Sequence, residues 1–70
     1  MTGKVIRSRS RVLKLDARKP DPSAAIDEQF GFIMADIIKE GGTYLNCSVN
    51  SYPTQEAPRI LITAIYEVEV

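Results

Sequence analysis

Three arginines at alternate positions form the most distinctive chemical pattern in this sequence. Residues 4–15 read K-V-I-R-S-R-S-R-V-L-K-L, which alternates in the manner of a β-strand. Because successive side chains of a strand point to opposite faces, Arg7, Arg9 and Arg11 share one face. Arginine presents its N–H donors in a planar fork that suits bidentate binding of phosphate. The triplet therefore predicts an anion site for a phosphate-bearing ligand, either a nucleotide or a nucleic acid.

Hydroxyl and amide groups from two strands are predicted to complete this site, and Tyr44 or Tyr52 could stack on a base. The predicted ligand-binding residues are Arg7, Arg9, Arg11, Ser8, Asn46, Ser48, Asn50 and Tyr52, with Ser10 nearby. The alternative is that the arginines pair with carboxylates of the same protein. Glu67 and Glu69 are the predicted partners, since opposite charges stabilise neighbouring strands.

The charge of the chain is balanced overall but unevenly distributed. Residues 1–20 carry seven Lys or Arg and one Asp, giving +6, whereas residues 21–70 carry two Lys or Arg and eight Asp or Glu, giving −6. A strongly basic protein would attract nucleic acid through its long-range field, but here the two halves largely cancel. The split favours complementarity within the chain or between subunits, and self-assembly without any ligand is a third interpretation.

The residue types argue against an enzyme. The chain has no His, so the usual catalytic base is absent, and its single Cys excludes an internal disulfide. The lack of His together with a single Cys also disfavours a zinc site. Cys47 is expected to be a buried, inert thiol. Gly41 and Gly42 follow a helix rather than opening one and lack the spacing of a phosphate-binding loop. We therefore predict a non-enzymatic protein without a metal or other cofactor.

One helix is predicted between the first strand and the rest. A loop at residues 16–20 leads to Asp21 as N-cap and Pro22 as the first helical residue, and the helix runs to about Glu40, where Gly41 and Gly42 end it, one of them in the left-handed conformation. At 100° per residue one apolar stripe forms, with Ile26, Phe30, Ile33, Met34, Ile37 and Ile38 as its members. Phe32 falls outside this stripe, which makes it a candidate contact for a partner.

Two further strands complete an α+β domain of β-α-β-β order that spans residues 1–70. They are predicted at 43–52 and 59–70, joined by a turn at 52–58, and a bulge near Arg11 is expected in the first strand. The third strand is apolar on both faces, so it should lie in the centre of a mainly antiparallel sheet of order 1-3-2, with the helix on one face. The other face would expose Leu61 and Ile65 and predicts a homodimer or a higher homo-oligomer, formed through that face or through a strand edge.

A second functional hypothesis is a protein–protein adaptor or inhibitor that acts through an exposed strand edge and Phe32. The compact β-α-β-β plan resembles in outline the small accessory proteins of phages and mobile elements. No apolar run reaches the roughly 20 residues of a membrane span, and charges interrupt the first 20 residues where a signal peptide would be apolar. A cytoplasmic protein without a membrane partner is therefore expected.

Overall fold

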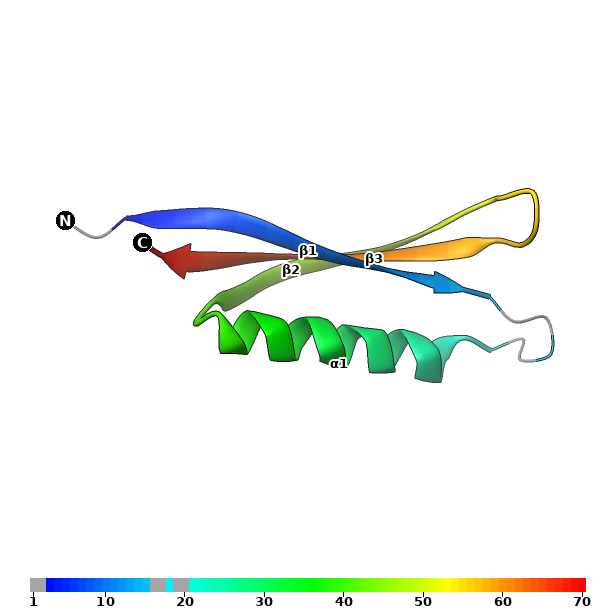
Figure 1. The fold of residues 1–70 in the computed structure, drawn as a ribbon, viewed down its shortest axis with the longest axis horizontal. Coiled ribbons are helices and arrows are strands. Elements are labelled where there is room, and N and C mark those ends of the chain that lie inside the picture. The colour runs from blue at the N-terminus through cyan, green and yellow to red at the C-terminus, as the bar shows by residue number, and fades with distance from the viewer. Residues whose placement is uncertain (1–2, 16–17, 19–20) are drawn as a thin grey trace.

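The computed structural model describes residues 3–15, 18 and 21–70, in which a helix packs beneath a long, narrow sheet (Figure 1). The elements in chain order are β1 (Lys4–Lys14), α1 (Ser23–Lys39), β2 (Thr43–Tyr52) and β3 (Arg59–Glu69). The strands form an antiparallel sheet of order β1-β3-β2. This confirms the predicted α+β class, the β-α-β-β order and the central place of the third strand. The predicted loop at 16–20 lies, apart from Arg18, outside the described residues.

The core lies between α1 and one face of β3. Its buried residues, all apolar or aromatic, are Ile33, Ile37, Ile60, Ile62, Ala64, Tyr66 and Val68. From the predicted stripe, Ile26, Phe30 and Met34 pack against this core. Ile38 does not, because it lies at the margin of the stripe and its residue surface is 69% exposed. A molecule only 14 Å across its narrowest dimension leaves that margin of the helix uncovered.

Both ends of α1 follow local chemistry, although the start differs from the prediction by one residue. The helix begins at Ser23 with Pro22 as N-cap, and Asp21 precedes it. The carboxylate of Asp21 accepts hydrogen bonds from the hydroxyl (2.6 Å) and the backbone N–H (3.0 Å) of Ser23. These two bonds lower the pKa of Asp21. At the other end Gly41 has a φ of 77°, the left-handed conformation that glycine adopts without strain.

The register of the sheet places the arginines on the face that α1 covers. Arg7, Arg9 and Arg11 lie opposite Tyr66, Ala64 and Ile62 of β3 without interruption. The predicted bulge near Arg11 is therefore wrong. The register shift occurs instead in β2, between Tyr44 and Asn46.

This shift changes the face on which Tyr44 lies. Tyr44 was predicted beside the asparagines, but it is opposite Tyr66 and thus on the helix side. Its ring meets Phe30 edge to face, with the ring centroids 5.8 Å apart. Such an aromatic pair stabilises the arrangement beyond the area it buries, and alternation alone could not reveal it.

The opposite face of the sheet has no helix over it (Figure 1). We call it the open face; its residues alternate with those of the helix side in all three strands. They are Lys4, Ile6, Ser8, Ser10, Val12 and Lys14 of β1, Arg59, Leu61, Thr63, Ile65, Glu67 and Glu69 of β3, and Thr43, Asn46, Ser48, Asn50 and Tyr52 of β2. Leu61 and Ile65 thus lie where they were predicted, along its central strand.

Candidate functional site

The arginine triplet meets α1 rather than open solvent. Arg7 donates a hydrogen bond to Glu40 Oε1, and Arg9 donates one to Glu40 Oε2 at 3.2 Å. Arg9 also lies 4.0 Å from a carboxylate oxygen of Asp36. Glu40 follows the last residue of α1, so these bonds join the edge strand β1 to the end of the helix.

Glu40 is the centre of this polar cluster. Its Oε2 atom also accepts a hydrogen bond from the hydroxyl of Tyr66 at 2.6 Å. The hydrogen bond from Tyr66, together with those from Arg9 and Arg7, lowers the pKa of Glu40. The same bond to Glu40, with burial, raises the pKa of Tyr66, and the bond to Glu40 raises the pKa of Arg9. The cluster therefore favours an ionised Glu40 between two cations and a protonated tyrosine.

Arg11 has different partners on the same helix. Its Nε atom donates to the side-chain oxygen of Gln29, and its guanidinium carbon lies 5.1 Å from the centroid of the Phe32 ring. This distance is typical of a cation–π contact. Phe32 is exposed, as predicted, but it lies on the β1 side of α1 beneath Arg11.

Glu67 and Glu69 are not the partners of the arginines, and that prediction is wrong. They were placed beside Arg7 or Arg9, but Glu67 lies on the open face and its carboxylate is 3.9 Å from Lys4. The arginines point to the other side of the sheet. The residues that sequence reasoning missed are Glu40 and Asp36, whose spacing of four in the helix is the only signal that they share a side.

The predicted ligand-binding set is divided between the two faces of the sheet. The arginines lie on the helix side, whereas Ser8, Asn46, Ser48, Asn50 and Tyr52 lie on the open face. Four of these five follow one another along β2, whereas Ser8 lies on β1, on the far side of β3, and none is beside the arginines. Binding of a phosphate-bearing ligand stays a prediction, and the carboxylates beside Arg7 and Arg9 occupy donors that it would need.

Cys47 is half-buried on the helix side, next to the core. Among the described residues, no group of three His, Cys, Asp or Glu side chains is arranged to hold a metal ion. Within the same residues, no helix has the length and apolar character needed to cross a membrane.

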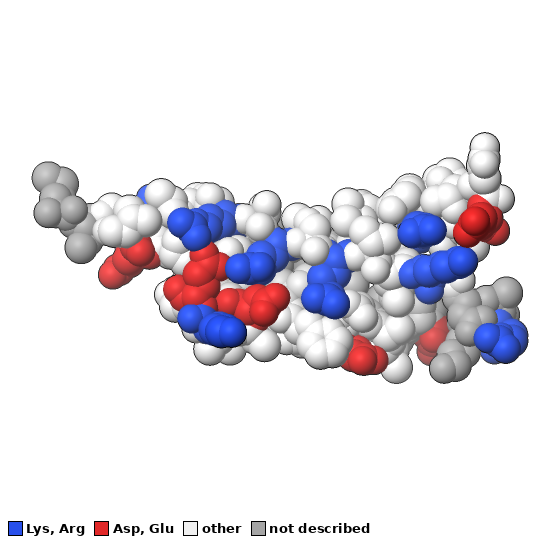
Figure 2. Space-filling model, viewed as in Figure 1, with Lys and Arg blue, Asp and Glu red and all other residues white. Residues whose placement is uncertain are grey.

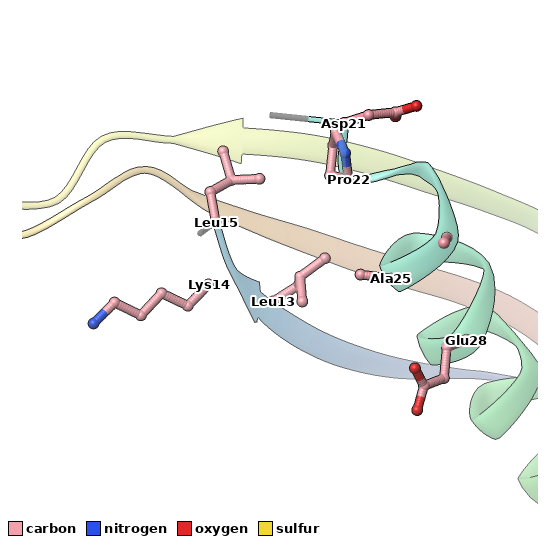
Figure 3. A pocket seen from close by; sticks show the side chains of 8 residues that line it. Leu13, Lys14, Leu15, Asp21, Pro22, Ala25 and Glu28 are labelled. Carbon is pink, nitrogen blue, oxygen red and sulfur yellow. The ribbon is translucent and has the colours of Figure 1, made fainter. Parts of the chain in front are cut away.

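A hollow of about 230 Å³ lies where the end of β1 meets the start of α1. Figure 3 shows the side chain of Leu13 pointing toward Ala25, while the ammonium group of Lys14 points away. Leu15 and Pro22 add further apolar surface. Because no set of polar groups from the described residues converges on this hollow, these residues do not define a site for a small ligand.

The two edges of the sheet differ in charge. The β1 edge carries Lys4, Lys14 and the three arginines, and Figure 2 shows Lys and Arg side chains in a row along the molecule, with a group of Asp and Glu side chains near its left end and others toward its lower and right margins. The β2 strand contains no charged residue in its ten positions. An edge strand without charge leaves its outer N–H and C=O groups open to pairing with another strand.

Apolar side chains accompany this uncharged edge. Val49 and Leu45 of β2 are 50% and 48% exposed. On α1, Met34 and Ile38 follow Phe30 at intervals of four residues, so all three lie on the side of the helix that faces β2. We call these residues the apolar β2 strip: Phe30, Met34 and Ile38 of α1 with Tyr44, Cys47 and Val49 of β2.

Comparison of the chain with protein-family models, with curated proteins and with solved structures gave no match.

Proposed function

We propose that the protein is a non-enzymatic protein–protein interaction module, an adaptor or inhibitor that binds an extended segment of a partner protein along the outer edge of β2. The observation that carries this proposal is that an edge strand without charged residues also bears exposed apolar side chains. In strand addition, backbone hydrogen bonds supply affinity and alternate side chains supply specificity.

The two faces of β2 define the chemistry of the partner. A segment added to β2 places every second side chain on the helix side, beside Cys47 and Val49. Those positions favour apolar side chains. The intervening positions lie beside Asn46, Ser48 and Asn50 on the open face, where polar side chains are favoured.

The opposite edge is a poor alternative for the same role. A strand added to β1 would meet Arg7, Arg9 and Arg11 on the helix side, where the side chains already contact α1. Charged residues on an edge strand are a common device that prevents unwanted pairing. The edge of the sheet that is available to the partner is therefore that of β2.

The test uses a labelled peptide in which valine and threonine alternate between terminal lysines, with a second peptide of the same composition but blocked order as control. We expect saturable binding of the alternating peptide by fluorescence polarisation, and amide protection in β2 by hydrogen exchange. Val49→Lys should abolish binding, because it places a charge on the uncharged edge. Val5→Lys, on the helix side of the β1 edge, is the matched control and should leave binding unchanged.

Two results would overturn the proposal. Equal binding of the alternating peptide by the wild type and Val49→Lys would show that the peptide does not bind along β2. Equal binding of both peptides would show that the alternating pattern is not recognised. A Val49→Lys protein that loses self-association rather than peptide binding would show that a second copy occupies β2. Thermal unfolding of each variant checks that loss of binding is not loss of the fold.

A further inference from the structure

The open face of the sheet carries a pattern that is complementary to itself. Along β3 the face presents Arg59, Leu61, Thr63, Ile65, Glu67 and Glu69 in that order, and the five residues from Arg59 to Glu67 form a row centred on Thr63. Thr63 lies at the centre of this row, with one aliphatic residue on each side of it. A cation follows at one end of the row and an anion at the other. A copy of this row turned end for end therefore matches it position by position.

We propose that the open face binds a second copy of this chain around a two-fold axis that lies in the plane of the interface, perpendicular to the strands, and passes through Thr63. Strand β3 of one copy then lies over β3 of the other in the opposite direction. Thr63 faces its own equivalent, Leu61 faces Ile65, and Arg59 faces Glu67. The Thr63 contact lies on the axis and occurs once, whereas each of the other two contacts occurs twice, as the isologous symmetry of a dimer requires.

Charge selects this arrangement over the other two-fold stacking of the same face. An axis parallel to the strands would place each residue of β3 opposite itself, so that Glu67 faces Glu67 and Arg59 faces Arg59. Shifting the perpendicular axis to Ile65 would place Thr63 opposite Glu67 and Leu61 opposite Glu69. Only the axis at Thr63 pairs aliphatic with aliphatic and cation with anion along the whole row.

The charged ends of the row are available for a partner. In the described part of the chain, Arg59 and Glu69 have no ion pair, and Glu67 has only the 3.9 Å contact with the exposed Lys4. The side chain of Lys14, which neighbours Arg59, lies 3.5 Å from Glu56. One end of the open face is thus basic and the other acidic, which a copy turned end for end neutralises at both ends.

The middle of the face is suited to close approach. The row across its centre consists of Ser10, Thr63 and Ser48, which are small, and the hydroxyls of Ser10 and Thr63 lie 3.1 Å apart. Hydroxyls that already bond to each other can be covered with little loss of hydrogen bonding. Ile6 and Val12 of β1, 61% and 50% exposed, add apolar surface beside the central row.

The area available predicts a reversible dimer. Strands of 10 and 11 residues at about 3.3 Å per residue, in three rows about 4.8 Å apart, give a face of about 500 Å² on each copy. The total of about 1,000 Å² lies at the lower limit for a specific interface. We therefore expect a weak dimer that dissociates on dilution. Dimerisation through the open face does not depend on what binds along β2.

A charge swap tests both the dimer and its register. Sedimentation equilibrium up to about 1 mM protein should show a monomer–dimer equilibrium for the wild type. Arg59→Glu and Glu67→Lys should each weaken association roughly tenfold, because each change sets like charges opposite one another twice per dimer. The double variant R59E/E67K restores opposite charges and should return the constant to within about twofold of the wild type.

Control variants separate the interface from the fold. Ile65→Ser should also weaken the dimer, whereas Ile38→Ser, on the exposed margin of α1, should not. Far-UV circular dichroism and thermal unfolding confirm that each variant is folded. The proposal is overturned if the wild type stays monomeric throughout, or if the double swap dimerises no better than the single variants. Single swaps without effect, in a protein that dimerises, would instead show that the face is stacked with like residues opposed or that another surface is used.

Discussion

The two edge strands border the same helix but contact it through different kinds of interaction. On the β1 side, Arg7 and Arg9 donate to Glu40, and Arg11 contacts Gln29 and Phe32, so the strand is joined to α1 by polar bonds. On the β2 side the contacts are apolar, and several of the side chains that make them remain exposed. The difference teaches that a row of charges can secure an edge against pairing, while the less conspicuous edge is the one left available for a partner.

The largest expected effect concerns what holds α1 to the sheet at all. Ile37 is fully buried in the last turn of α1, on the side of the helix that faces the core. Ile37→Ala should lower the free energy of unfolding by about 2–5 kcal/mol, because it removes buried methyl groups and leaves a cavity. Chemical denaturation measures this directly. The neighbouring variant Ile38→Ala, at a residue 69% exposed, is the control and should change stability by no more than about 0.5 kcal/mol.

If instead the polar bonds on the β1 side held the helix, Ile37→Ala would cost no more than the loss of Glu40. That outcome would break the comparison, since the β1 contacts would then be the main attachment and the apolar core secondary.

An intermediate effect is expected from Glu40→Gln, which keeps the size of the side chain and removes its charge. The variant should unfold at lower denaturant than the wild type, though at higher denaturant than Ile37→Ala, because Arg7, Arg9 and Tyr66 all bond to this carboxylate. Asp36→Asn is the matched control, since its only ion pair spans 4.0 Å and its side chain is half exposed. A similar loss in both variants would mean that general charge, rather than the Glu40 cluster, stabilises this side.

The loss of folding stability at acid pH gives an independent measure of the Glu40 cluster. The folded-state pKa of Glu40 lies below its ordinary value of 4.5, so its contribution is fully present above that pH and is lost as the pH falls through the lowered value. The wild type should therefore lose stability faster below about pH 4.5 than Glu40→Gln does. Unfolding midpoints measured from pH 7 down to the acid transition check this, and parallel curves would contradict it.

How far the sequence could lead is visible in the contrast between β3 and β2. The alternation of β3 is complete, so its buried face, its central position and the place of Leu61 and Ile65 on the open face all followed from period and composition. In β2 the bulge at Leu45 shifts Tyr44 to the helix side, and nothing in the order of residues marks it. The partners of the arginines were missed for a related reason. They lie on the helix, and which edge of the sheet a given side of a helix borders depends on the packing angle rather than on any local pattern.

The close packing at Gly42 is a further feature that local sequence does not reveal. A Cβ atom at this position would lie 2.7 Å from the ring of Tyr66 and 3.2 Å from Ile37. The turn after α1 therefore needs glycine for space at this residue, whereas Gly41 needs it for its positive φ.

The smallest expected effect tests whether Phe32 belongs with the binding edge, as the sequence suggested, or with β1. Its ring lies under Arg11, so a double-mutant cycle of Phe32→Leu and Arg11→Gln should give a coupling of about 0.5–1 kcal/mol in the free energy of unfolding. Since this contact is on the β1 side of α1, Phe32→Leu should leave binding of the alternating peptide at β2 unchanged. Loss of peptide binding in Phe32→Leu, with no coupling to Arg11, would place the partner on the side of the helix that borders β1 and reverse the assignment of the two edges.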